Sequence, residues 1–157
     1  MPASYTQKML NSLASSSDAT LKSFIDCSGV QLREPIRTKY TSETAVKLLC
    51  KSYELLKNLE KDEIKTVIET TERGFVLHNL MRDQPFIVDT IRMQLLSAGA
   101  SNVTGYNIVV QTYHNEDGTL QKVSAPLQVA PTLTSIVRFE VEGAMGSTHN
   151  EIKEKVN

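Results

Sequence analysis

The sequence predicts an α+β protein in which a helical segment, residues 1–62, precedes an antiparallel sheet packed with helices, residues 63–157. Three observations predict this class. Apolar residues recur at helical spacing in the first part of the chain. From about Asp62 onward the pattern changes to β-branched alternation interrupted by turn residues. A single long helical pattern stands among the predicted strands, and such segregation of strands and helices is typical of an α+β fold.

Composition narrows the classes of protein that this chain can represent. Its 157 residues suit one domain with a small appendage, and 40% are hydrophobic, which is enough for a core. The chain has 17 Lys and Arg and 18 Asp and Glu, for a net charge of −1. This balance argues against a protein that coats nucleic acid or anionic membranes. We find neither a membrane-spanning apolar run nor a secretory signal, so we expect a cytoplasmic protein with Cys27 and Cys50 reduced.

The helical segment begins with a short helix over Tyr5–Leu13. The run Ser15-Ser16-Ser17-Asp18 indicates a break and a new N-cap, and the helix that follows ends near Gly29. Thr41 or Ser42 caps the strongest helix of this part of the chain. Its apolar stripe follows a 3.6-residue period through Ala45, Leu48, Leu49, Ser52, Leu56 and Leu59.

The sheet begins with two strands, over 64–71 and 75–80, that we expect to form a hairpin with Gly74 at a positive φ. A helix follows them. Asp83 is its predicted N-cap, and Pro85 falls in its first turn, where a missing N–H costs little. The helix buries a stripe made of Ile87, Val88, Ile91, Leu95 and Leu96, and Gly99 ends it.

The last strands follow this helix. A strand over 106–114 leads into a turn at Asp117-Gly118, which predicts positive φ at both residues, and 119–124 returns antiparallel. The alternation over 135–142 predicts a strand with one wet face. Its apolar face carries Val137, Phe139 and Val141, and its polar face carries Arg138, Glu140 and Glu142.

Catalytic motifs are mostly absent from the sequence. It has no glycine-rich dinucleotide or phosphate loop, and its three histidines lack metal-ligand spacing, so we expect no catalytic residue, bound cofactor or metal in this chain. Cys50 and His78 are interpreted as structural residues, and a small enzyme that uses either of them is the weakest hypothesis.

The candidate ligand or interface site is the junction where a strand meets the N-terminus of the helix, because backbone N–H groups there can bind an anion such as an amino-acid carboxylate. Simple helix capping is the alternative for the residues before the helix, and a solvated carboxylate is the alternative for the acidic residue inside it. The site comprises Arg82, Asp83, Gln84, Phe86 and Asp89.

The segment 78–93, HNLMRDQPFIVDTIRM, resembles the P-F-L-V-D-S-V signature near the N-terminus of the large NAD-dependent glutamate dehydrogenases. Pro85, Phe86, Val88 and Asp89 match that signature. The order of parts also fits over roughly residues 20–157. The departures are Arg82, Asp83 and Gln84, where the family usually has an acidic pair and a methionine, and the next strand lacks the His-Pro often found there.

The resemblance implies an ACT-like, ferredoxin-like regulatory region with a β-α-β-β-α-β plan, lying far upstream of a catalytic domain that binds NAD. Its partners would be the rest of the parent polypeptide, another copy of itself and an amino-acid effector, with neither nucleic acid nor membrane. A helix predicted from Thr148 lacks a closing strand, so we expect a domain truncated at its C-terminal end. The alternative is a stand-alone ACT-like module for amino-acid sensing or protein interaction.

Overall fold

The computed structural model describes residues 4–13, 15–126 and 133–143. Within them, a group of helices precedes an antiparallel five-stranded sheet, which confirms the predicted α+β class and its helical start. The helices of this segment are α1 (Tyr5–Ser12), α2 (Ala19–Gly29), α3 (Ile36–Lys39) and α4 (Ser42–Lys57).

Side-chain caps define where these helices begin, as the sequence predicts. The carboxylate of Asp18 accepts a hydrogen bond from the N–H of Leu21 at 3.0 Å, at the start of α2. The hydroxyl of Thr41 accepts one from the N–H of Thr44 at 3.2 Å, at the start of α4. Each cap satisfies a backbone donor that the first turn of a helix leaves without a partner.

The sheet has the strand order β1-β2-β5-β3-β4. Strand β5 lies between β2 and β3 and runs antiparallel to both. Helix α5 connects β2 to β3 along the chain. These three strands and α5 therefore form a split β-α-β unit. The predicted helix from Thr148 lies outside the described residues. The elements are β1 (Lys65–Thr70), β2 (Gly74–Arg82), α5 (Ile87–Ser97), β3 (Asn102–His114), β4 (Leu120–Ser124) and β5 (Thr134–Glu142).

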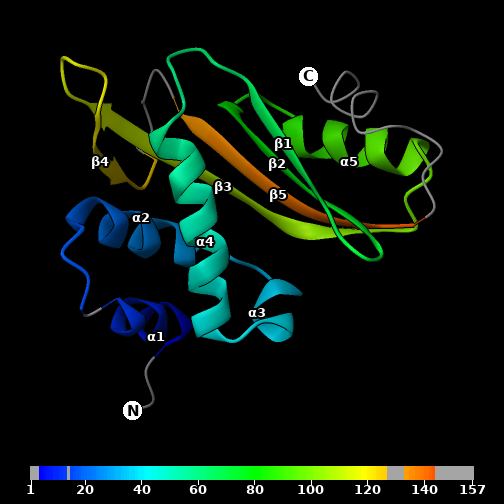
Figure 1. The fold of residues 1–157 in the computed structure, drawn as a ribbon, viewed down its shortest axis with the longest axis horizontal. Coiled ribbons are helices and arrows are strands. Elements are labelled where there is room, and N and C mark those ends of the chain that lie inside the picture. The colour runs from blue at the N-terminus through cyan, green and yellow to red at the C-terminus, as the bar shows by residue number, and fades with distance from the viewer. Residues whose placement is uncertain (1–3, 14, 127–132, 144–157) are drawn as a thin grey trace.

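Both faces of the sheet are covered (Figure 1). Helix α5 packs through Ile91 and Leu95 on one face. The helical segment packs on the opposite face, where α4 residues such as Leu49 share one core with sheet residues such as Ile136. The predicted wet face of β5 is therefore wrong, since Arg138 is only 8% exposed. Periodicity within one strand does not reveal what another part of the chain places over its polar face.

Two turn predictions need correction. Gly74 is not at a positive φ; it lies within β2, where a Cβ would meet the carbonyl oxygen of Val141 at 2.0 Å. In the β3–β4 turn Gly118 has a φ of 89° but Asp117 is not at a positive φ, and the Gly118 N–H donates to the carbonyl of Asn115 at 3.0 Å. A left-handed glycine after a standard turn also closes a hairpin, so two positive φ values are not required.

The end of α5 follows the prediction. Gly99 has a φ of 109°, and its N–H donates to the carbonyl of Leu96 at 3.1 Å. The N–H of Ala100 donates to the carbonyl of Leu95 at 3.2 Å. This pair of bonds is a Schellman motif, which satisfies carbonyl groups that the last turn of the helix leaves open. Leu96 itself is 49% exposed, so the buried stripe of α5 is narrower than predicted.

Candidate functional site

The predicted junction lies between the end of β2 and the first turn of α5. Arg82 ends β2 opposite Thr134 of β5, and the N–H of Asp83 donates to the carbonyl of Leu133 at 2.8 Å. Gln84 is exposed. Strand pairing therefore continues one residue beyond β2, through the position predicted to start the helix.

Asp83 is not the N-cap of α5, and Pro85 is not in its first turn. The N-cap is Phe86, which has a left-handed conformation with φ 64° and makes no side-chain capping bond. Phe86 is 78% exposed, and Asp89 is exposed in the first turn of the helix. The prediction failed because Asp83 continues the backbone pairing with β5, and the chain turns into the helix only after Pro85.

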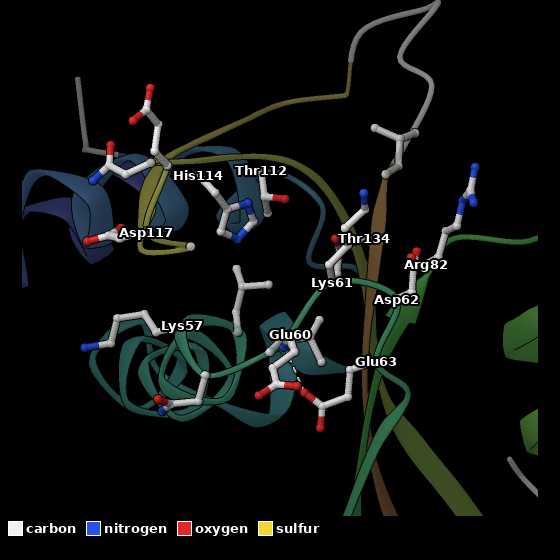
Figure 2. Close-up of a pocket in the computed structure, with 17 residues that line it drawn as sticks. Lys57, Glu60, Lys61, Asp62, Glu63, Arg82, Thr112, His114, Asp117 and Thr134 are labelled. Carbon is white, nitrogen blue, oxygen red and sulfur yellow. Dashed lines mark hydrogen bonds between the residues drawn. The ribbon is translucent and has the colours of Figure 1, made fainter.

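A cavity of about 600 Å³ lies beside Arg82 (Figure 2). The α4–β1 loop, which we define as residues 58–64, and the end of α4 form one wall. The other wall is the β3–β4 hairpin, from Thr112 to Gly118, and the sheet contributes Arg82 and Thr134. Of the five predicted site residues, Arg82 lines this cavity and the other four do not.

Charged side chains of both signs surround the cavity. Figure 2 shows Lys57 and Glu60 on the helix side and His114 on the hairpin side, with Lys61 and Arg82 toward the sheet. The sequence reasoning missed all of these except Arg82. The Asp-Gly turn marks the hairpin, but a local pattern does not predict that the hairpin faces the end of α4.

A second group of polar residues lies around His78, in the middle of β2. His78 is 1% exposed, and neither ring nitrogen has a hydrogen-bond partner among the described residues. Its Nε2 lies 3.8 Å from a carboxylate oxygen of Glu69. On the neighbouring strand β5, the residue directly opposite His78 is Arg138. Burial lowers the pKa of His78 to about 4 against the opposing effect of the Glu69 charge, so the imidazole is neutral at pH 7.

Two carboxylates of this region bind the helical segment. Lys51 of α4 places its Nζ 2.8 Å from Glu69, and this hydrogen bond is the main reason that the pKa of Glu69 lies below its ordinary value. Glu140 of β5 accepts a hydrogen bond from the Tyr40 hydroxyl and forms an ion pair with Lys39. We call Lys39, Tyr40, Lys51, Glu69, His78, Arg138 and Glu140 the ionic cluster; it attaches helices to the sheet.

The cysteines do not have the environment of nucleophiles. Cys27 is buried, and burial raises the pKa of its thiol to about 11. Burial also raises the pKa of the half-buried Cys50 thiol, with Glu54 as a smaller cause. A nucleophilic cysteine needs a lowered pKa, because the thiolate is the reactive form. Both pKa shifts have the opposite direction, so burial does not favour thiolate chemistry at these positions.

Two features are absent from the described residues. No group of three or more His, Cys, Asp or Glu side chains is placed to hold a metal ion in residues 4–13, 15–126 and 133–143. Over the same ranges, no helix has the length and apolar character needed to cross a membrane.

Comparison with known proteins adds no relative to this description. No family model, no curated protein and no solved structure matches the chain. The assignment of a function therefore depends on the residues and the geometry described above.

Proposed function

We propose that this chain is a non-catalytic regulatory or assembly domain of a large, cytoplasmic NAD-dependent glutamate dehydrogenase. The observation that supports it most is the split β-α-β unit: β2 and β3 flank β5, and α5 joins them. An ACT-like plan requires this arrangement, and the signature-like segment 78–93 runs through its β2–α5 junction. In this proposal NAD binds in the catalytic part of the parent enzyme.

The regulatory part of the proposal places an amino-acid effector at the β2–α5 junction. Arg82 can pair with a carboxylate there, and the backbone N–H groups at the start of α5 favour an anion. An effector that binds one arrangement of the domain better than another shifts the population toward it. Couplings between two sites of this kind are typically about 1–3 kcal/mol.

The assembly part draws on apolar side chains that α5 and its N-cap leave exposed. Phe86 is 78% exposed, Met93 66% and Leu96 49%. Exposed apolar groups gathered on one element suit contact with another surface. In the proposal that surface belongs to the parent polypeptide or to another copy. The same observation favours a second candidate function, a stand-alone ACT-like protein-interaction module.

The size of the natural polypeptide tests the proposal. An antibody against this domain is used to probe a lysate of the source cells. We expect a band far heavier than 17.5 kDa, the mass of the chain. A band at 17.5 kDa would reject the dehydrogenase and leave the stand-alone module.

A further inference from the structure

The two edge strands of the sheet, β1 and β4, have different surroundings. The outer edge of β4 is covered, because α2 packs beside this strand and the hydroxyl of Thr20 donates to the carbonyl of Gln121 at 3.1 Å (Figure 1). The pairing of β3 with β4 also shifts its register between Tyr113 and His114, and such an irregularity disfavours further pairing. The edge to which another strand can be added is therefore β1.

The outer edge of β1 presents backbone groups that do not bond to β2. The Thr71 N–H donates to the Gly74 carbonyl at 2.9 Å, so Thr71 directs its N–H toward β2. Bonded and non-bonded positions alternate along an antiparallel pair. The N–H and carbonyl groups of Ile68 and Thr70 therefore point away from β2. Among the described residues, β2 is the only strand that pairs with β1.

The residue types of β1 also suit an added strand. Four of its six residues are β-branched, and it contains neither proline nor glycine, which would interrupt pairing. Lys65, Val67 and Glu69 lie on one face of the strand, because side chains alternate between faces. All three are partly exposed. This face thus has a positive charge, an apolar side chain and a negative charge in a row.

That row is complementary to itself in one antiparallel register. When Val67 lies opposite Val67 of a second copy, Lys65 of each copy lies opposite Glu69 of the other. Directly opposite residues have Cβ atoms about 4.5–5.5 Å apart, which is within reach of an ion pair. The adjacent registers that keep the same backbone groups bonded place Glu69 opposite Val67 or Glu63 instead, so only the register centred on Val67 forms both ion pairs.

The present contacts of the two charged residues leave room for this pairing. Glu69 accepts from Lys51 of α4, but its side chain is 42% exposed, and a carboxylate can accept from more than one donor. Lys65 donates to the carbonyl of Asn58 at 3.1 Å, and an ammonium group has two further N–H bonds to donate.

We propose that two copies of this chain pair along β1, antiparallel and centred on Val67, so that their sheets become continuous. Such a contact is isologous, since each copy contributes the same residues. It goes beyond the proposed function, because a stand-alone module and a domain of a dehydrogenase can pair in the same way. The exposed apolar residues of α5 belong to another element and remain available to the rest of a longer polypeptide.

Sedimentation velocity of the full chain over a range of concentrations tests the contact. We expect a dimer with twice the 17.5 kDa mass of the chain. Lys65→Glu and Glu69→Lys each place like charges opposite one another at two symmetric positions, and each should raise the dissociation constant at least about tenfold. Lys8→Glu on α1 and Glu116→Lys in the β3–β4 hairpin are the matched controls at exposed positions and should leave it unchanged.

A mixture of the two charge variants separates the register from any effect on folding. Glu69→Lys also removes the ion pair with Lys51, so circular dichroism first establishes that each variant is folded. A mixed pair of Lys65→Glu and Glu69→Lys chains again has opposite charges at both positions, and we expect it to form about as tightly as the parent dimer. Ile68→Pro removes an N–H that points away from β2, so the dimer should be lost while the fold is kept.

A chain that stays monomeric at all concentrations would overturn the proposal. A dimer that Phe86→Ser weakens and Lys65→Glu does not would also overturn it, since that result assigns the contact to α5. Folded charge variants whose mixture does not restore the dimer would reject the register. The immunoblot is independent: a heavy band together with a monomeric chain rejects this inference alone, and a dimer together with a band at 17.5 kDa rejects only the dehydrogenase.

Discussion

The hydroxyl oxygen of Ser52 on α4 lies 2.5 Å from the phenolic oxygen of Tyr106 on β3, and both side chains are buried. The Tyr106 hydroxyl also donates a hydrogen bond to the carbonyl oxygen of Leu48 at 3.3 Å. Burial raises the pKa of Tyr106 to about 12, so the phenol stays protonated at neutral pH. A specific polar contact thus fixes the helical segment on the sheet within their shared core.

Tyr106→Phe is expected to lower the free energy of unfolding by about 1–2 kcal/mol, because it leaves the buried Ser52 hydroxyl without this partner. Ser52→Ala and the double variant complete a mutant cycle, measured by urea denaturation. We expect a coupling energy of about 1 kcal/mol between the two positions. Additive effects of the two substitutions would contradict the contact.

Acid is expected to destabilise the protein through His78. The unfolded imidazole has an ordinary pKa of 6.5 and the folded one a pKa of about 4, so the unfolded state takes up the proton first as the pH falls. The free energy of unfolding is therefore unaffected by this group above about pH 6.5 and decreases between that value and about pH 4, by up to about 3 kcal/mol. Urea denaturation at several pH values measures the slope.

His78→Gln is expected to flatten this slope, even if it lowers stability at neutral pH, because glutamine does not titrate. His114→Gln, at an exposed position in the hairpin, is the matched control and should keep the slope of the parent protein. Glu69 contributes only at lower pH, since its pKa lies below its ordinary value. An unchanged slope in His78→Gln would show that another group is responsible.

Gly105 on β3 is expected to tolerate no side chain. A Cβ at this position would lie 1.8 Å from the carbonyl oxygen of Arg138 on β5. Gly105→Ala should therefore cost about 3 kcal/mol or more of unfolding free energy, through displaced backbone. Gly118→Ala is the comparison: its φ of 89° is strained for alanine, but no atom lies within 4 Å, so about 1 kcal/mol is expected. Thermal unfolding measures both, and equal losses would contradict the close approach.

The two thiols are expected to react slowly with a thiol-specific reagent in the folded protein. Burial raises the pKa of both Cys27 and Cys50, so little thiolate is present at neutral pH. Both thiols should react much faster in urea than in native buffer. Native labelling of Cys50 at or above the rate in urea would instead revive the hypothesis of a small enzyme.

The sequence predicted helix starts and ends correctly where they depend only on residues nearby in the chain. Asp18 and Thr41 cap their helices, and Gly99 ends α5, because each of these roles depends on neighbours within a few residues. The same reasoning failed at Asp83, whose N–H donates to the carbonyl of Leu133, a residue distant in sequence that directly precedes β5. It also failed at Gly74, which is needed for close approach to β5.

The candidate site was predicted only in part for the same physical reason. Arg82 follows from the strand-to-helix pattern, and it does line the cavity. Glu60 and Glu116 belong to segments more than fifty residues apart, and only the packing of the helical segment on the sheet brings them to one cavity. The polar face of β5 was misjudged likewise: Arg138 is 8% exposed, and Glu140 is bound by Tyr40 and Lys39 of the helical segment.

The proposal that this chain belongs to a large NAD-dependent glutamate dehydrogenase is tested most directly by the enzymatic activity that accompanies the chain in the source cells. An antibody against this domain is used for immunoprecipitation, and the precipitate is assayed for reduction of NAD by glutamate. We predict NADH formation that requires both glutamate and NAD, from a polypeptide far larger than 17.5 kDa. A precipitate that contains the chain but does not reduce NAD in the presence of glutamate would contradict the claim.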